Sequence, residues 1–183
     1  MPTVTTSIAA TAQEGQSALP SFANVVEMHK GMVYSIAWQF LRDRLAADEL
    51  AQDVFLQLHK NWARMESPAH LIFWLRKVAT HRAIDAARKR KAHAETSLEE
   101  TDEPTVFERV HDSFLSSYLQ RMVASLPEKQ RSVIILRYQE DMELEEIAKT
   151  LDMNVSTVKT QISRALELLR GKVSRRLGKG CGQ

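Results

Sequence analysis

The segment from Glu145 to Arg170, EEIAKTLDMNVSTVKTQISRALELLR, contains two helical patterns separated by a very short break. Before the break, the apolar residues at helical spacing are Leu144, Ile147, Ala148 and Leu151. After it they are Val158, Ile162, Ala165, Leu166 and Leu169. Asn154 ends the break and is placed to cap the second helix by accepting a backbone N–H near Ser156 or Thr157. The pattern predicts a helix-turn-helix, because the small Ala148 allows two helices to cross closely.

The second helix of this motif has an outward face of short hydrogen-bonding groups and two cations. Its members are Ser156, Lys159, Thr160, Ser163 and Arg164. Such a face suits base edges and phosphates in a major groove of DNA. The alternative is an ordinary helical hairpin in a bundle, whose polar face is only solvated.

The rest of the chain also favours helices. Its 183 residues are 44% hydrophobic and 26% charged, which is typical of a globular protein. Helical stripes run from residue 22 to residue 91, and the first consists of Met28, Met32, Ile36 and Phe40. No segment shows a convincing alternating strand pattern, so we expect an all-α fold of two small helical domains.

A second helical stripe places an isolated leucine among acidic groups. Its apolar side consists of Leu50, Ala51, Val54, Phe55, Leu58 and Trp62. The opposite side carries Asp48, Glu49, Gln52 and Asp53, with Leu56 in their midst. An apolar anchor surrounded by acidic groups is typical of a binding patch for a basic protein partner. The alternative is a single surface leucine without a role, which is common.

A third helical stripe carries aromatic and basic residues on its outer side. The side expected to face the core consists of Leu71, Leu75, Val78, Ala79 and Ala86. The other side carries Phe73, Trp74, Lys77, His81 and Arg88. Aromatic rings between cations suit unstacked bases beside a phosphate backbone. The alternative is that Trp74 packs in the core and that the cations are only solvated. We expect Trp74 to pack in the core at least in part.

Changes in residue composition along the chain predict two helical domains with a leader, a linker and a tail. Residues 1–21 are small and polar and predict a flexible leader, whereas residues 22–92 predict a first helical domain. Residues 95–112 contain seven acidic residues and one arginine, so we expect an acidic flexible linker over residues 93–112. Residues 113–173 then predict a second helical domain, and residues 174–183 a basic flexible tail.

Several functional classes lack support in the sequence. The single Cys181 excludes an internal disulfide, and neither a basic signal-peptide start nor an apolar run of membrane-spanning length is present. His59, His70 and His81 lack the further ligands of a metal site, and no phosphate loop or catalytic triad pattern occurs. We therefore expect a cytoplasmic protein without cofactor, metal, enzymatic activity or membrane insertion.

Together these motifs resemble a known family. The stretches DELAQDVFLQLHKNW (48–62) and FWLRKVATHRAIDAARKRK (73–91) resemble domain 2 of bacterial sigma-70 family RNA polymerase sigma factors. The stretch from Leu126 to Arg170 is similar to their domain 4. The order of the two domains and the short linker between them, which leaves no room for a domain 3, are typical of the extracytoplasmic-function (ECF) group.

The resemblance implies roles for individual residues. Binding to the clamp helices of the RNA polymerase β′ subunit is implied for Asp48, Glu49, Gln52, Asp53 and Leu56. Contacts with the −10 promoter element are implied for Lys77, His81, Arg82, Asp85 and Arg88. Contacts with the −35 element are implied for Ser156, Thr157, Lys159, Thr160, Ser163 and Arg164. The family often has Asn at the position of His81 and Gly at that of Ser156.

The resemblance further implies that the second domain binds the β flap of core polymerase and that an anti-sigma factor holds the protein inactive. The alternative function is a stand-alone helix-turn-helix transcriptional regulator that binds duplex DNA without polymerase. The acidic surface around Leu56 and the aromatic–basic helix argue against this alternative, because a simple repressor requires neither.

Overall fold

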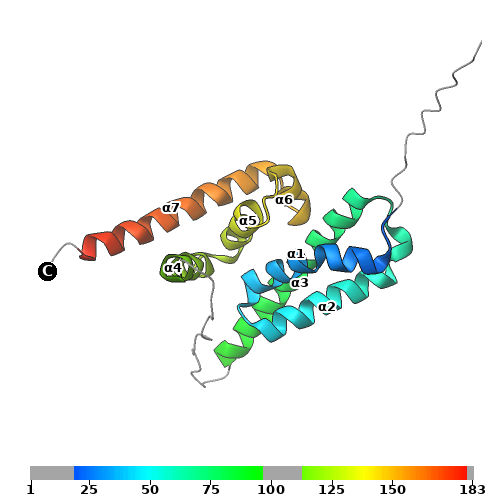
Figure 1. Cartoon of the computed structure of the whole chain (residues 1–183). Coiled ribbons are helices and arrows are strands. Elements are labelled where there is room, and N and C mark those ends of the chain that lie inside the picture. Colours follow the sequence, from blue (N-terminus) through cyan, green and yellow to red (C-terminus); the bar gives the residue numbers. More distant parts are fainter. Residues whose placement is uncertain (1–18, 97–112, 181–183) are drawn as a thin grey trace, which may run out of the picture.

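The computed structural model describes residues 19–96 and 113–180, and all regular structure within these ranges is helical (Figure 1). The first range holds three α-helices and one short 3-10 helix: α1 (Phe22–Leu41), α2 (Arg44–Lys60), η1 (Trp62–Arg64) and α3 (Pro68–Thr96). The second range holds four: α4 (Ser113–Ala124), α5 (Glu128–Tyr138), α6 (Leu144–Thr150) and α7 (Val155–Gly180). The expected all-α fold with two helical domains is confirmed.

Short polar side chains begin the helices of the first domain. Ser21 accepts a hydrogen bond from the backbone N–H of Asn24, and Asp43 accepts one from Ala46. Such caps satisfy N–H groups that have no partner within the helix. Helices α1, α2 and α3 then pack around a core whose fully buried side chains include Val33, Ile36, Val54, Leu58, Leu71 and Leu75.

One expectation for α1 is wrong. Met28 was expected in the buried stripe, but its side chain is 58% exposed. Val25 and Val33 are buried instead, on the same side of the helix as Ile36 and Phe40. Methionines at 28 and 32 fit the spacing of that stripe, but spacing alone does not show how far the neighbouring helices extend.

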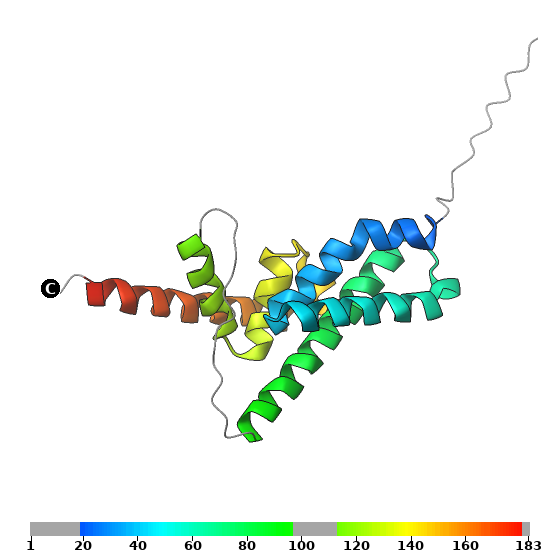
Figure 2. The same cartoon turned by 60° about the horizontal axis from the view of Figure 1, so that its bottom comes forward.

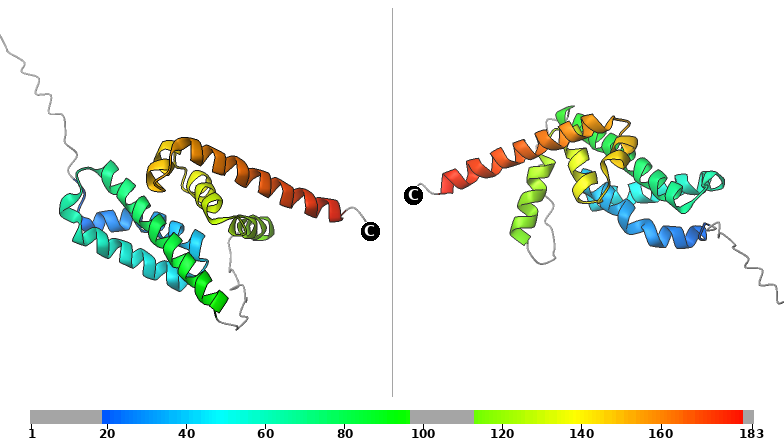
Figure 3. Two further views of the ribbon diagram at one scale, coloured as in Figure 1. Left: turned by 180° about the vertical axis from the view of Figure 1, so that it is seen from behind. Right: turned by 90° about the horizontal axis from the view of Figure 1, so that it is seen from above.

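The second domain has two small cores. The larger lies where α5, α6 and α7 meet and contains Val133, Leu136, Met142, Ile147, Ala148 and Val158. The smaller joins Leu126, Ile134 and Ala165. Figures 2 and 3 show that α7 then continues away from the first domain, with α4 beside it.

Two helices extend past the expected domain limits. Helix α3 continues to Thr96, beyond residue 92, and α7 continues to Gly180, beyond residue 173. The described part of the predicted tail, residues 174–180, is therefore helical. Most of the predicted leader (residues 1–18), most of the acidic linker (residues 97–112) and Cys181 lie outside the described residues.

The two domains lie against each other. Helix α6 packs on α3, and Ile135 of α5 is fully buried in the core of the first domain. Partly buried Val123 and Leu151 of the second domain pack against the same core. This docking brings together helices that are distant in the sequence, and it decides which of the predicted site residues are free.

Candidate functional site

The acidic side of α2 is exposed, as the sequence predicts. Leu56 is 60% exposed, and Asp48, Glu49, Gln52 and Asp53 are also exposed. Leu50, Val54 and Leu58 are buried on the opposite side. An exposed leucine in the middle of an acidic helix face is therefore a real feature of this surface.

The structure divides these five residues between two hollows. Asp48, Gln52 and Leu56 border a groove of about 970 Å³ between α1 and α2. Its other lining residues include Phe22, Val26, Tyr34 and Phe55. Glu49 and Asp53 face α3 instead and border a second hollow of about 420 Å³. The wide, largely apolar groove is shaped to accept a helix with apolar side chains.

Helix α3 begins with a capped turn. Ser67 accepts a hydrogen bond from the backbone N–H of His70 at 3.1 Å, and Pro68 occupies the first helical position. Trp74 is partly buried against the core of the first domain, in agreement with its expected partial packing. Phe73 is half-buried as well, so the rings of this helix are only partly available to a ligand.

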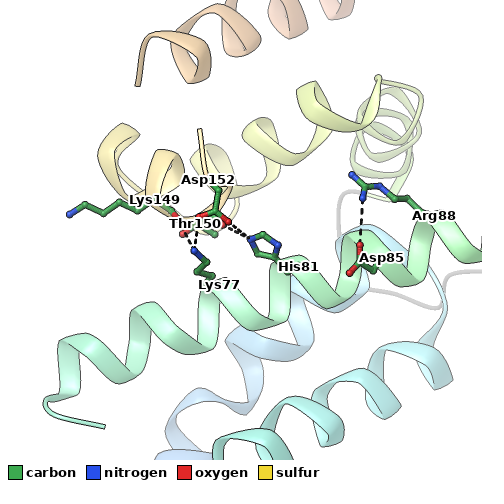
Figure 4. A network of polar contacts seen from close by, with 7 residues as sticks. All are labelled: Lys77, His81, Asp85, Arg88, Lys149, Thr150 and Asp152. Carbon is green, nitrogen blue, oxygen red and sulfur yellow. Dashed lines mark hydrogen bonds and ion pairs between the residues drawn. The ribbon is translucent and has the colours of Figure 1, made fainter. Parts of the chain in front are cut away.

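Lys77 and His81 of α3 contact the helix-turn-helix of the second domain (Figure 4). The Lys77 ammonium lies 2.7 Å from a carboxylate oxygen of Asp152 and 3.4 Å from the carbonyl oxygen of Lys149. His81 Nε2 donates to the carbonyl oxygen of Thr150 at 2.6 Å and lies 3.6 Å from the other Asp152 oxygen. The hydrogen bond from Lys77 lowers the pKa of Asp152 and keeps it ionised.

Arg88 contacts the second domain about two turns after His81 along α3. Its guanidinium group donates to both carboxylate oxygens of Glu128 at 2.8 and 2.6 Å, a two-point contact. Asp85 lies 3.5 Å from the same guanidinium (Figure 4). The hydrogen bonds from Arg88 lower the pKa of Glu128, although burial opposes that shift.

Arg82 does not join this group. It donates to Gln57 at 3.0 Å and to Asp53 at 2.9 Å, both on α2. The five residues expected at the −10 element therefore separate into two sets. Lys77, His81 and Arg88, with Asp85 beside it, lie toward the second domain, and Arg82 faces α2.

The turn of the helix-turn-helix is built as predicted. Asp152 has a positive φ of 52°, which short polar residues tolerate better than most. Asn154 Oδ1 accepts the backbone N–H of Thr157 at 2.8 Å, so the expected N-cap of α7 is confirmed. At the start of α6, Glu143 and Glu146 form a capping box.

The outer side of α7 is open. Exposed side chains are those of Ser156, Lys159, Thr160, Ser163 and Arg164, whereas Thr157 is half-buried. The hydroxyls of Ser156 and Thr157 donate to Asn154, and that of Thr160 donates to the carbonyl oxygen of Ser156. The N-terminus of a helix also attracts phosphate through its free N–H groups. This surface combines hydroxyls with two cations and suits the major groove of duplex DNA.

The structure also contains an apolar groove between α4 and α7, which the sequence did not predict. Leu119, Met122 and Val123 of α4 face Leu166, Leu169 and Val173 of α7 across a hollow of about 300 Å³. Leu119 is 49% exposed, which is unusual for a leucine that lies beside other apolar groups. The helical spacing of Leu119 and Met122 was a signal for this surface, but the spacing could not show that the groove stays open.

A second group missed by the sequence analysis joins the two domains. Ser35 of α1 donates to Glu140 at 2.9 Å, and the guanidinium of Arg131 lies 5.7 Å from the centre of the Phe40 ring. Burial raises the pKa of Glu140, while the hydrogen bond from Ser35 opposes this. No local sequence pattern links residues 105 positions apart, so only the folded structure reveals this contact.

Within residues 19–96 and 113–180, no group of three or more His, Cys, Asp or Glu side chains could hold a metal ion. None of the helices formed by these residues is long and apolar enough to cross a membrane.

Comparison with known proteins agrees with this architecture. The family model for sigma-70 region 2 matches residues 25–93, and that for sigma-70 region 4 matches residues 116–169. The first match covers α1 to α3, and the second covers the helix-turn-helix and the helices beside it.

Individual relatives are similar over most of the chain. SigW, an ECF RNA polymerase sigma factor of Bacillus subtilis, is 29% identical over 163 residues, which is 82% of this chain and 87% of SigW. The RNA polymerase sigma factor SigV of the same organism is 29% identical over 145 residues, which is 78% of this chain and 84% of SigV.

A solved structure shares the fold. The sigma factor RpoE in its co-crystal structure with the anti-sigma factor NepR from Bartonella quintana superposes with a TM-score of 0.71 at 19% identity. The superposition covers 85% of this chain and 98% of RpoE. The fold and the two region matches define a sigma factor with regions 2 and 4. The chain belongs to the sigma-70 family of RNA polymerase sigma factors, in the ECF group.

Proposed function

We propose that this chain is a promoter-specificity subunit, which binds core RNA polymerase and directs initiation at promoters with matching −35 and −10 elements. The observation that carries the proposal is the pairing of two surfaces on one chain. The first domain exposes Leu56 within the acidic side of α2, and the second exposes the polar side of a helix-turn-helix. A stand-alone regulator needs only the second surface.

In this proposal, core polymerase is held at two places. The groove bordered by Asp48, Gln52 and Leu56 receives the β′ clamp helices, with Glu49 and Asp53 adding negative charge beside it. The apolar groove between α4 and α7 receives the β flap. An apolar anchor supplies most of the affinity at such a site. Asp48, Glu49 and Asp53 attract a basic partner, and Lys30 and Arg44, which also line the groove, can pair with its acidic groups.

The two domains divide promoter recognition. The outer side of α7 lies in the major groove of the −35 element, with Lys159 and Arg164 near phosphates and the hydroxyl groups near base edges. Lys77, His81, Arg82, Asp85 and Arg88 of α3 hold unpaired bases and phosphates of the −10 element after the duplex opens. Two modest sites on one chain gain affinity from their connection.

This function involves no chemistry on a substrate, and we propose that the chain is not an enzyme and acts in the cytoplasm with polymerase. A regulatory partner also fits the family. RpoE is bound by the anti-sigma factor NepR in its co-crystal structure, and CnrH, at 20% identity and a TM-score of 0.63, is bound by the cytosolic domain of CnrY. We expect an anti-sigma factor for this chain as well.

Run-off transcription tests the proposal. Purified bacterial core polymerase is incubated with a pool of promoter fragments, with and without this chain. Specific transcripts that require the chain are the expected result. The absence of transcripts, together with a shift of duplex DNA by the chain alone, would instead favour a stand-alone regulator.

A further inference from the structure

Two glycines, Gly31 and Gly171, lie inside long helices. Gly31 is in the middle of α1, and Gly171 is in the C-terminal half of α7. Neither has a positive φ. A Cβ atom added at either position would meet no atom within 4 Å beyond the local helix backbone and the adjacent residues. The fold itself therefore requires glycine at neither position.

Glycine inside a helix is unfavourable for the free chain. It leaves the unfolded backbone more freedom than alanine does, so it lowers the folding equilibrium constant about two- to fivefold relative to alanine. Packing within the chain does not offset this loss at Gly31, because the position is exposed and has open space around it. Any advantage of glycine at position 31 therefore comes from contact with another molecule.

The surroundings of Gly31 and Gly171 differ. Gly31 lines the groove of about 970 Å³ between α1 and α2, to which Leu56 also contributes. Gly171 lines neither this groove nor the groove between α4 and α7. Of the two glycines, Gly31 alone is thus placed at a surface already proposed to hold core polymerase.

The α1 wall of the groove has a ridge of side chains at four-residue spacing. Its members are Phe22, Val26, Lys30 and Tyr34. Such ridges fit into the spaces between the side chains of a facing helix. Gly31 is a gap beside this ridge, at which the backbone of α1 forms the surface.

The side chains one turn before and one turn after Gly31 suit contact with a partner. Met28 and Tyr34 lie three residues before and after it, and residues at this spacing are neighbours on a helix surface. Met28 is 58% exposed, and a flexible methionine adapts its shape to an apolar partner. Its exposure, which packing within the first domain does not explain, fits a contact surface that extends from the groove across Gly31.

An α-helix is the partner that gains most from such a gap. Packed helices have axes roughly 8–10 Å apart, depending on the side chains at the contact, and glycine allows the closest approach. Because the groove lies between α1 and α2, a third helix can pack against both walls. Leu56 then anchors it on the α2 wall, while Gly31 admits its backbone on the α1 wall.

The charges around the groove agree with a protein helix as the occupant. Lys30 and Arg44 are basic and Asp48 is acidic, and all three line the groove. A surface with both signs beside apolar groups complements an amphipathic helix that also carries both signs. A nucleic acid strand, which is uniformly negative, would be repelled by Asp48 and would leave the apolar lining unmatched.

We propose that Gly31 is the point of closest approach to core polymerase: a helix of core polymerase in the groove passes the α1 backbone at Gly31, between Met28 and Tyr34. This inference rests on the proposed function, in which the groove beside Leu56 holds core polymerase. A side chain at position 31 pushes the partner helix away from α1 and disturbs its contact with Leu56. The absence of a side chain therefore determines which helix fits.

Stability and affinity should respond to one substitution in opposite directions. Gly31→Ala gains helix propensity in the free chain, because the added methyl group meets nothing there. The same methyl group occupies space that the partner helix needs. A residue with only a structural role would not couple a more stable free chain to weaker binding.

The test uses a graded series at position 31 in the full-length chain. Gly31→Ala adds one methyl group, and Gly31→Gln adds a longer, uncharged side chain that still favours a helix. The matched control is Gly171→Ala. It makes the same change inside another helix, at a position that lines neither groove and where a Cβ atom likewise meets no atom within 4 Å.

The first readout is thermal unfolding of the free chain. Gly31→Ala and Gly171→Ala should each raise the folding equilibrium constant about two- to fivefold, which appears as a higher melting temperature. A lower melting temperature of Gly31→Ala would overturn the proposal, because the fold itself would then require glycine at this position.

The second readout is the affinity for purified core polymerase, measured by competition with labelled wild-type chain. Gly31→Ala should bind about three- to tenfold more weakly and Gly31→Gln at least about tenfold more weakly, because added atoms in a packed contact force the partners apart. Gly171→Ala should bind like wild type. Wild-type affinity of both Gly31 variants would overturn the proposal. Equal weakening by Gly171→Ala would also overturn it, because the effect would not depend on the groove.

The same assay separates this proposal from the proposed function. A wild-type chain without affinity for core polymerase would contradict the proposed function and, with it, the role of Gly31. Weak binding of Leu56→Arg together with unchanged binding of Gly31→Ala and Gly31→Gln would contradict only the close approach at Gly31.

Discussion

Asn154 Oδ1 accepts three hydrogen bonds at the start of α7, from the backbone N–H of Thr157 at 2.8 Å and from the hydroxyls of Ser156 at 2.8 Å and Thr157 at 2.6 Å. One amide oxygen thus fixes both the first turn of the helix and the orientation of two hydroxyl groups on the proposed DNA surface.

Asn154→Ala should therefore destabilise the second domain and weaken duplex binding. Loss of an N-cap costs about 1 kcal/mol. Urea unfolding measures this loss of stability. Asn154→Asp is the control, because it keeps an oxygen acceptor for the cap and should lose much less of the free energy of unfolding. Equal stability of Asn154→Ala and wild type would show that the cap contributes nothing.

Glu140→Gln should strengthen docking at neutral pH. Burial raises the pKa of Glu140 in the docked state, so docking is favoured while the carboxyl is protonated and loses this contribution as pH rises through the raised value. The amide of the substituted side chain can still accept from Ser35 and does not ionise. Distance measurements from about pH 4 to about pH 8 should show wild type opening more than the variant as pH increases.

The lowered pKa values of Glu128 and Asp152 act in the opposite direction, since their contribution is lost as pH falls. The comparison between wild type and Glu140→Gln removes their effect, because both proteins contain them. A difference between the two proteins that does not change with pH would contradict this account.

Ile147→Ala should destabilise the helix-turn-helix strongly. Ile147 is fully buried between α5, α6 and α7, and an isoleucine-to-alanine change in a core costs about 2–5 kcal/mol. Leu168→Ala on α7 is the control, since Leu168 is 39% exposed. Thermal unfolding measures the stability of both variants. An equally small loss of stability in Ile147→Ala and Leu168→Ala would refute the prediction.

Lys159→Ala and Arg164→Ala should weaken the binding of duplex −35 DNA. Each lost phosphate contact should also reduce the slope of log affinity against log salt by about 1. Lys129→Ala, which alters a cation on α5 away from the outer side of α7, is the control and should keep the wild-type slope. Fluorescence anisotropy at several salt concentrations measures both quantities, and an unchanged slope in both α7 variants would exclude phosphate contacts there.

Local patterns predicted much of this fold. The cap at Asn154, the exposed Leu56 and the partial packing of Trp74 all follow from side-chain chemistry and helical spacing, which act over a few residues. Met28 does not follow its stripe, because burial also depends on which helix lies opposite.

Sequence patterns could not predict the contacts between the two domains. Lys77 and Arg88 were expected on a surface open to DNA, yet they pair with Asp152 and Glu128. Nothing in the spacing of α3 distinguishes a cation that binds phosphate from one that binds a carboxylate of another domain. Arg82 of α3 was also expected at the DNA surface, but it donates to Asp53 on the neighbouring helix α2.

The binding of core polymerase tests the central claim most directly. Affinity for purified core is measured for wild type, Leu56→Arg and the control Leu45→Arg, which alters an even more exposed leucine of α2 that does not line the groove. The account predicts that Leu56→Arg weakens binding at least about tenfold, as for a central anchor residue, while Leu45→Arg binds like wild type. Equal affinity of all three proteins would contradict the claim that the groove beside Leu56 holds core polymerase.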